Sequence, residues 1–265
     1  MTLTLTLRRP PEVPLDADVL APDRLAAAED VAALPLWHGK ERVRVGDFFA
    51  VSGSGDDVRL EGDLSRVNGI GAGMTGGRLT VDGDAGDWAG AGMRGGTLVV
   101  RGSAGKRLGG AYAGERAGMR GGEIVVHGDV GPQAGAGLRR GLIAVGGRAG
   151  EAAGLRMLAG TIVALGGLGP RAGAGMRRGS LVTMAPLEPL STFVFSCVYR
   201  PPFLRLYLRR LLALGLDVPL GGRYARWCGD SVESRRGEIL ILCREAGGRT
   251  SPSERGPDAP RRYPL

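Results

Sequence analysis

Hydrophobic residues in the middle of the chain recur in pairs spaced by two, with glycines at fixed positions around them. A typical pair, Leu98 and Val100, begins five residues after Met93. A spacing of two places both side chains on the same face of a β-strand. The Met or Leu before each pair stands at positions 74, 93, 119, 138, 157 and 176, so the intervals are 19, 26, 19, 19 and 19 residues. This period predicts a solenoid, because a unit this short cannot bury a core without its neighbours.

Glycines mark where each unit turns. In the unit that begins at Gly90, the phrase Gly-Ala-Gly-Met is followed by Gly96 and, after the strand, by Gly102. Glycine suits positions that need a positive φ or where two backbones approach too closely for a Cβ atom. Stacked strands and glycine corners predict an all-β fold, a right-handed parallel β-helix, since strand crossovers prefer that hand. A strand spacing of about 4.8 Å makes the repeat region roughly 30 Å long.

The pattern changes on both sides of the repeat. We predict an N-terminal cap over residues 1–57, a β-helix repeat region over 58–186, a C-terminal cap with a short helix over 187–246 and a flexible tail over 247–265. Caps are needed because the end of a rod exposes unpaired backbone. The flanks are expected to hold strands at Thr2–Leu7, Arg42–Val51, Phe193–Tyr199, Arg223–Trp227 and Glu238–Cys243, helices at Asp23–Leu34 and Phe203–Leu214, and an irregular first rung at Val58–Gly62.

Composition narrows the class of partner. The 265 residues include 48 Gly and carry a net charge of +8, and nearly all the basic residues are Arg. A basic protein attracts nucleic acid, membranes, acidic proteins or polyanionic small molecules. The three cysteines form no paired motif, and no apolar run has the length of a membrane span. We therefore expect a cytoplasmic protein with reduced thiols. We also predict no membrane or nucleic-acid partner and no bound metal.

Several motifs that could indicate chemistry have a better structural interpretation. Gly90-x-Gly92-x-x-Gly95 matches a dinucleotide fingerprint, but a strand follows it where that motif needs a helix. The methionines of the repeat are expected to fill the core, because Leu138 takes the same place. His127 is expected to be an ordinary surface histidine at the end of its strand. No nucleophile with a base, pair of carboxylates or metal cluster is found, so we predict no catalytic residue.

Arginines after the repeated Met or Leu form the first candidate binding surface. In a stacked fold they lie in a column along the outside of the rod, interrupted by Leu158. Like charges about 5 Å apart cost on the order of 1 kcal/mol in water. The side chains either splay into solvent or form a track for the carboxylates of an acidic partner or polyanionic ligand. The candidates are Arg94, Arg120, Arg139, Arg140, Arg177 and Arg178.

The one longer unit forms the second candidate. Its 26 − 19 = 7 extra residues fall in the segment from Lys106 to Arg116. An insertion in a solenoid leaves the rod as a loop and often contacts a partner, although a tolerated surface loop gives the same pattern. The residues singled out in this loop are Lys106, Arg107, Tyr112 and Arg116.

The repeat as it stands at Gly90–Gly105 resembles that of the formylmethanofuran dehydrogenase C subunit, and it is also similar to the C-terminal β-helical domain of the glutamate synthase large subunit. The segments Tyr224–Asp230 and Gly237–Leu240 resemble the C-terminal part of standalone C subunits. The resemblance implies a β-helical subunit of a hetero-oligomeric complex that processes formyl groups. Its closest form is the formyltransferase/hydrolase complex of methylotrophic bacteria.

That complex moves formyl between tetrahydromethanopterin and a methanofuran analogue and releases formate. The resemblance assigns no catalytic residue and no cofactor to this chain alone, beyond a contact of the arginines with the acidic tail of a methanofuran-type cofactor. Three alternatives stay open: a subunit of a molybdenum or tungsten formylmethanofuran dehydrogenase, a glutamate-synthase-like module, and an acyltransferase-like enzyme that uses His127.

Overall fold

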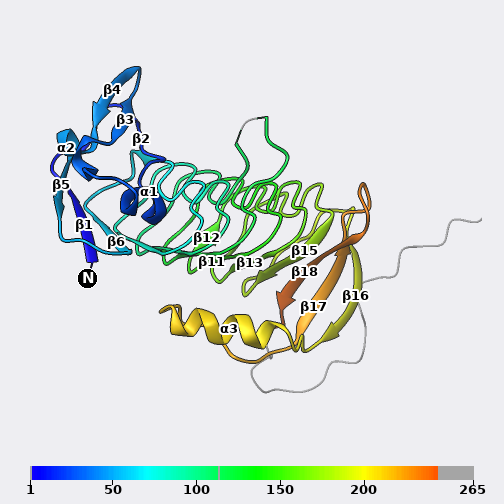
Figure 1. The fold of residues 1–265 in the computed structure, drawn as a ribbon. Coiled ribbons are helices and arrows are strands. Elements are labelled where there is room, and N and C mark those ends of the chain that lie inside the picture. Colours follow the sequence, from blue (N-terminus) through cyan, green and yellow to red (C-terminus); the bar gives the residue numbers. More distant parts are fainter. Residues whose placement is uncertain (1, 113, 244–265) are drawn as a thin grey trace, which may run out of the picture.

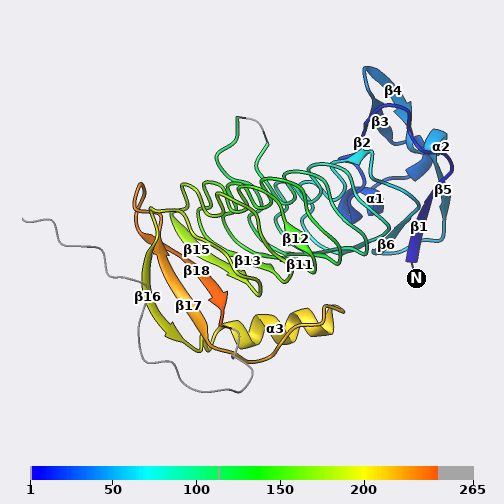
Figure 2. The same ribbon diagram turned by 180° about the vertical axis from the view of Figure 1, so that it is seen from behind.

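The computed structural model describes residues 2–112 and 114–243, which are mostly β with few helices (Figure 1). The tail predicted over 247–265 lies outside the described residues. In the described part, no helix is long and apolar enough to cross a membrane. The chain winds through a row of stacked coils between an N-terminal cluster of short elements and a C-terminal group of longer strands (Figures 1 and 2).

One sheet of 12 strands runs along the whole row, in the order β16-β17-β18-β15-β13-β11-β10-β9-β8-β6-β1-β5. The pairings from β1 to β18 are parallel, and the outer pairings of β5, β17 and β16 are antiparallel. The strand bounds are β1 Thr2–Leu7, β5 Phe49–Ser52, β6 Asp57–Glu61, β8 Arg78–Asp82, β9 Thr97–Val100, β10 Glu123–Val126, β11 Leu142–Val145, β13 Thr161–Ala164, β15 Arg178–Thr183, β16 Val194–Tyr199, β17 Tyr224–Gly229 and β18 Arg236–Leu242.

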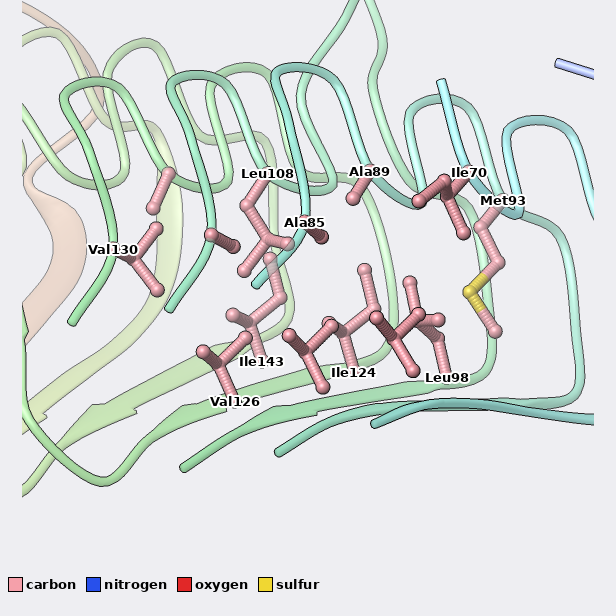
Figure 3. Packing of buried hydrophobic residues seen from close by; sticks show 14 of the residues in the cluster. Ile70, Ala85, Ala89, Met93, Leu98, Leu108, Ile124, Val126, Val130 and Ile143 are labelled. Carbon is pink, nitrogen blue, oxygen red and sulfur yellow. The ribbon is translucent and has the colours of Figure 1, made fainter. Parts of the chain in front are cut away.

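Equivalent residues of successive units stack in the interior, as the aliphatic spacing predicts. Ile124 of β10 pairs in register with Leu98 on one side and Ile143 on the other, and all three are fully buried. The column of Met and Leu residues is also fully buried, which confirms that these methionines are core residues. A second wall of parallel bridges joins Ala85, Ala104 and Val130, so the coils enclose a core of small aliphatic side chains (Figure 3).

The turn at Gly122 shows why glycine recurs at the corners. Its φ of +88° lies in the left-handed region, which L-residues with a side chain rarely adopt. A Cβ atom here would lie 2.7 Å from both the carbonyl oxygen of Gly96 and the terminal methyl of Met93. Both the conformation and the approach of the preceding coil therefore require glycine.

The N-terminal segment differs from its predicted elements in two places. The helix expected at Asp23–Leu34 is two short pieces, because Asp30 accepts a hydrogen bond from the Ala32 N–H at 2.9 Å and starts a separate turn. The strand expected at Arg42–Val51 is broken by a helical turn, where the Asp47 carboxylate accepts the Arg44 N–H at 2.8 Å. The remaining N-terminal elements are β2 Leu15–Asp16, α1 Pro22–Ala26, the 3₁₀ turn Val31–Ala33, β3 Pro35–His38, β4 Glu41–Arg44, α2 Val45–Phe48 and β7 Val67–Asn68.

The first rung is more regular than its sequence indicates. Strand β6 pairs in continuous parallel register with β8, from Asp57 opposite Arg78 to Glu61 opposite Asp82. On its other side it pairs with β1, so the first strand of the chain lies between β5 and β6. Two further short strands, β12 Arg148–Ala149 and β14 Gly167–Leu168, pair in the second wall.

Helix α3, Leu204–Ala213, lies along the outer face of the large sheet (Figures 1 and 2). Its leucines share a buried cluster with residues of six strands, from Val125 of β10 to Leu240 of β18 and Tyr224 of β17. The Arg210 guanidinium anchors the helix by donating two hydrogen bonds to the Glu123 carboxylate, at 2.8 and 3.0 Å. The amphipathic helix predicted at Phe203–Leu214 is therefore confirmed, and it covers the middle of the sheet as well as its end.

Asp230 fixes the C-terminal turn and gives the fold a measurable pH dependence. Its buried carboxylate accepts the N–H of Gly175 at 2.9 Å and that of Val232 at 3.0 Å. Burial acts to raise the pKa of Asp230, but the hydrogen bonds to the charged form outweigh it, so the pKa lies below its ordinary value.

We expect Asp230→Asn to lower the free energy of unfolding by about 1–3 kcal/mol at pH 7, because two N–H groups lose a charged acceptor. A depressed folded-state pKa stabilises the fold above the unfolded-state pKa of about 4, and this contribution is lost as the pH falls through the folded-state value. The difference in unfolding free energy between the unchanged protein and the Asp230→Asn variant should therefore narrow below pH 4. Urea unfolding at pH 7, 5, 4 and 3 measures it, and a difference that stayed constant would contradict the assignment.

Candidate functional site

The predicted arginine column exists because the main chain repeats the same hydrogen bond in each coil. The N–H of Arg120 donates to the carbonyl oxygen of Met93 at 2.7 Å, and that of Arg139 donates to the carbonyl oxygen of Met119 at 2.9 Å. Each of these residues thus lies directly above its equivalent in the preceding coil, with the side chain exposed. The equivalent N–H bonds place Arg94, Leu158 and Arg177 in the same column, and Arg140 and Arg178 follow it as exposed neighbours.

The insertion loop, residues 106–116, begins inside the row of coils, where Leu108 is fully buried, and its described residues after Gly110 project from the row (Figure 1). An aromatic stack holds its base. Tyr112 stacks on Trp88 with the ring centroids 5.4 Å apart and 13° between the planes, and the Arg107 guanidinium carbon lies 4.7 Å from the centroid of the Trp88 ring. Arg107 also donates a hydrogen bond to the Gln133 side-chain oxygen at 2.8 Å. Burial raises the pKa of Tyr112, so its hydroxyl stays protonated at neutral pH and can act as a donor.

Two cavities flank the insertion loop, and Tyr112 and Glu115 line both. The larger cavity, about 750 Å³, lies between the loop and the C-terminal coils, and its charged lining is Arg107, Arg116, Arg156, Arg177, Glu115 and Glu233. The smaller cavity, about 450 Å³, lies toward the N-terminal coils, and its charged lining is Arg24, Arg94, Arg120, Asp18, Asp23 and Glu115.

The loop therefore divides the predicted column between two sites. Arg94 and Arg120 line the smaller cavity, and Arg177 lines the larger one. Of the predicted loop residues, Arg107, Tyr112 and Arg116 line the larger cavity. The remaining candidates line neither cavity: they are Lys106, Arg139, Arg140 and Arg178. Lys106 is instead engaged with Asp87, at 3.2 Å.

Ion pairs occupy only some of the arginines. Arg177 is paired with Glu233 at 3.1 Å, and Arg24 with Asp18 at 3.2 Å. Within residues 2–112 and 114–243, no carboxylate lies within 4 Å of the guanidinium of Arg94, Arg116, Arg120, Arg139, Arg140, Arg156 or Arg178. An exposed guanidinium without a partner presents its donors to solvent or to an incoming anion, and its planar fork matches a carboxylate.

Arg156 is the site residue that the repeat analysis missed. It stands where Gly73, Gly92, Gly137 and Gly175 stand in other coils, and its φ of +51° lies in the same left-handed region. An arginine in that conformation costs about 1–2 kcal/mol relative to an ordinary backbone. The signal was present in the sequence, since the phrase Gly-Ala-Gly-Met reads Gly-Leu-Arg-Met at positions 154–157.

Groups for covalent or metal chemistry do not gather at this surface. His127 is half-buried, and a Cβ atom at Gly215 would lie 3.3 Å from its ring, so the chain that follows helix α3 passes close to it. Among the described residues, no group of three or more His, Cys, Asp or Glu side chains could hold a metal ion. What the arrangement offers chemically is recognition of negative charge by arginine side chains.

The fold and the site together define a protein of stacked β-coils with exposed arginines along one side. No protein-family model matches the chain. In the crystal structure of the formyltransferase/hydrolase complex from Methylorubrum extorquens with methylofuran, one chain is 33% identical to this one. It superposes with a TM-score of 0.78, over 91% of this chain and 100% of that chain.

Curated relatives of the chain are C subunits of formylmethanofuran dehydrogenases. The C subunit of the molybdenum-containing formylmethanofuran dehydrogenase 1 from Methanosarcina barkeri is 34% identical over 83 residues, which are 28% of each chain. The C subunit of the tungsten-containing formylmethanofuran dehydrogenase 2 from Methanothermobacter thermautotrophicus is 37% identical over 90 residues, 31% of this chain and 33% of that protein. The alignments span a third or less of these curated relatives. With the full-length structural match, they show that the chain belongs to the family of formylmethanofuran dehydrogenase C subunits.

Proposed function

We propose that this chain is a scaffold subunit, without a catalytic group of its own, in a formyltransferase/hydrolase complex of one-carbon metabolism in a methylotroph. The complex would move formyl groups between tetrahydromethanopterin and a methanofuran-type cofactor and release formate. The observation that carries this proposal is the match to a chain of such a complex over all of that chain. A binding surface made of arginines rather than of nucleophiles and bases supports the non-catalytic role.

The proposal includes the architecture as a right-handed parallel β-helix with capped ends. The parallel register at intervals of 19 residues and the second wall of bridges support it. Antiparallel strands β5 at one end and β17 and β16 at the other act as the caps, because they pair the backbone that the outermost parallel strands would leave open.

A second candidate is a subunit of a molybdenum or tungsten formylmethanofuran dehydrogenase, which the curated relatives favour by name. The two candidate complexes, the formyltransferase/hydrolase and the dehydrogenase, differ in the metal content of the partner chains. The decisive experiment is to tag this chain in its native cell, purify it, identify the chains that come with it and measure molybdenum and tungsten. Formyl-processing chains without either metal are expected. A tagged chain that purifies alone as a stable monomer contradicts both candidates, and co-purifying glutamate synthase chains would support a glutamate-synthase-like module.

The exposed part of the arginine column is proposed to dock an acidic surface of a partner chain or the acidic tail of a methanofuran-type cofactor. Arg120 and Arg139 are stacked in adjacent coils and have no carboxylate partner among the described residues. Complementary charge of this kind contributes mainly to orientation and to the rate of association.

We expect the double variant Arg120→Glu, Arg139→Glu to weaken assembly or cofactor retention by at least about tenfold, because two attractive contacts become repulsive. Quantitative co-purification at constant expression measures the change. The matched control is Arg78→Glu, Arg148→Glu, which alters the net charge equally at exposed positions outside the column that form no ion pair among the described residues. Equal yields of partner chains from both double variants would show that the arginine column is only a solvated surface and binds no partner.

A further inference from the structure

A further cavity, of about 480 Å³, lies at the start of helix α3, where the helix approaches the ends of β16 and β17 (Figure 1). Its wall is made by the chain between β16 and the helix, by the first turns of the helix, and by the loop before β17 together with the first residue of that strand. It shares no lining residue with the two cavities beside the insertion loop, and no arginine of the column lines it.

Most of the wall is apolar and is held in place by the core. Leu204 and Leu208 of helix α3 and Tyr224 of β17 line the cavity, and all three belong to the buried cluster that packs the helix on the sheet. Leu220 lines it from the loop before β17, with 45% of its surface exposed. A preformed apolar cavity of this size is typical of a small-molecule site, because binding then requires little ordering of the protein.

The charged side chains in the wall are both positive. Arg200 follows β16, and Arg205 stands in the first turn of helix α3. Both are exposed, and in the described part of the chain no carboxylate lies within 4 Å of either guanidinium. No described Asp or Glu lines the cavity, and burial raises the pKa of Tyr224 to about 12, so its phenol is uncharged at neutral pH. The cavity therefore joins an apolar wall to two positive charges that no described side chain offsets.

We propose that this cavity binds a small molecule with a compact apolar body and a single carboxylate, with Arg200 and Arg205 as the residues that bind the carboxylate. The planar fork of a guanidinium matches a carboxylate, and the apolar body would contact the leucines and the tyrosine ring of the wall. The site goes beyond the proposed function, because it holds for either candidate complex and uses no residue of the arginine column.

Other ligands fit the cavity less well. A molecule with several negative charges would have to leave water against a largely apolar wall, where only two side chains could compensate for the lost hydration. A cation would be repelled by both arginines. An uncharged apolar molecule would use the wall but leave the arginines without an anion, so it serves as a comparison ligand in the test.

The residues of this chain after β18 are another possible occupant, because β18 ends beside the cavity. The N–H of Cys243 donates to the carbonyl oxygen of Arg223 at 2.8 Å, and Arg223 stands between two residues that line the cavity. Residues 244–265 contain five Arg against three Asp and Glu, which leaves a net charge of 5 − 3 = 2, positive like the cavity. Charge therefore disfavours this segment and favours an anion.

The test is equilibrium binding of hydrocinnamate, a phenyl ring joined to a carboxylate by two methylene groups, to the full chain by calorimetry. The unfolding temperature is the second measurement, because a ligand that binds only the folded state stabilises it. Hydrocinnamyl alcohol keeps the apolar body without the charge, and propionate keeps the carboxylate without the ring. Inorganic phosphate tests for an anion without an apolar body, and a synthetic peptide of residues 244–265 tests the chain's own segment as a competitor.

The first pair of variants tests the charges. The double variant Arg200→Gln, Arg205→Gln removes both arginines from the wall. Its matched control is Arg209→Gln, Arg223→Gln, which removes two exposed arginines that stand near the cavity without lining it and form no ion pair among the described residues. Both double variants change the net charge equally, so a general electrostatic effect cannot separate them.

The second pair of variants tests the cavity itself. Gly221 lines the cavity, has no positive φ and has nothing within 4 Å of its Cβ position, so Gly221→Phe introduces a ring that can fill the space. Gly76→Phe is the matched control, because Gly76 has the same freedom but lies outside the cavity. The unfolding temperatures of the ligand-free variants show that each one is folded.

We expect hydrocinnamate to bind the unchanged chain and raise its unfolding temperature, and the alcohol, propionate and phosphate to bind at least about tenfold more weakly. Arg200→Gln, Arg205→Gln and Gly221→Phe should each weaken hydrocinnamate binding by about tenfold or more, and each control by less than about twofold. No binding, equal binding of the alcohol, equal effects within either pair of variants, or displacement of hydrocinnamate by the peptide would each overturn the proposal.

Discussion

Replacing Gly122 by alanine should destabilise the protein by about 3 kcal/mol, a large effect for the addition of one methyl group. The new Cβ would lie 2.7 Å from the Gly96 carbonyl oxygen and from the terminal methyl of Met93, and 2.9 Å from the carbonyl carbon of Gly95. The backbone of the preceding coil can move away only by breaking the pairing of β10 with β9. Overpacking of this kind costs about 1–3 kcal/mol, to which the positive φ adds about 1–2 kcal/mol.

Two other glycines separate these contributions. Gly92 has φ +64° but nothing within 4 Å of its Cβ position, so Gly92→Ala should cost only about 1 kcal/mol. Gly76 has neither a positive φ in this region nor a neighbour within 4 Å, and Gly76→Ala should be close to neutral. Chemical denaturation measures the free energy of unfolding of the three variants, Gly122→Ala, Gly92→Ala and Gly76→Ala. Similar losses for Gly122→Ala and Gly92→Ala would show that the coils are not in contact at this corner.

The second large effect is expected where helix α3 meets the sheet. Leu211 is fully buried between the helix and the outward-facing residues of the sheet, and Leu211→Asp should lower the free energy of unfolding by at least about 4 kcal/mol. The variant removes a buried leucine and places a carboxylate where no partner exists in the cluster, so it must be desolvated or the helix must leave the sheet.

Leu206 provides the control on the same helix. Its side chain is 71% exposed, so Leu206→Asp should change the stability by less than about 0.5 kcal/mol. Thermal unfolding with a probe of exposed apolar surface distinguishes the two variants. If both behaved alike, helix α3 would not be packed on the sheet in solution, and the outer face would have to be covered in another way.

The interior of the fold could be predicted from the sequence because its signal repeats. The aliphatic pairs, the column of Met and Leu residues and the corner glycines recur with few exceptions over six units, such as Thr183 in the last pair, so one interpretation explains all of them. The position of helix α3 was not predicted, although a signal exists. Val125, Ala144, Val163 and Val182 are apolar at the outward position of their strands, which a solvent-facing sheet would not require.

The candidate site was predicted only in part, for a related reason. Arg177 and the loop residues Arg107, Tyr112 and Arg116 were found because they follow or interrupt the period. Arg156 also interrupts the period, but its unit was grouped with the others by its flanking Gly154 and Met157. The contributions of Arg24 and Glu233 come from the two flanks of the chain, and no local pattern indicates which turn of the coil they approach.

Because helix α3 contacts the large-sheet strands from β10 to β18 but not β6 or β8, the two halves of the stack are expected to unfold with different cooperativity. In a solenoid each coil is stabilised by its two neighbours alone, so segments can open one after another from an end. The helix shares one buried cluster with β10, β11, β13, β15, β17 and β18, and it therefore links these strands into a single unit that opens together. Strands β6 and β8 have no such link. Local opening would thus progress from the N-terminal coils and stop near β10. This leaves Arg156 and Arg177 of the larger cavity on the half that stays closed, whereas Arg107 and Arg116 precede β10.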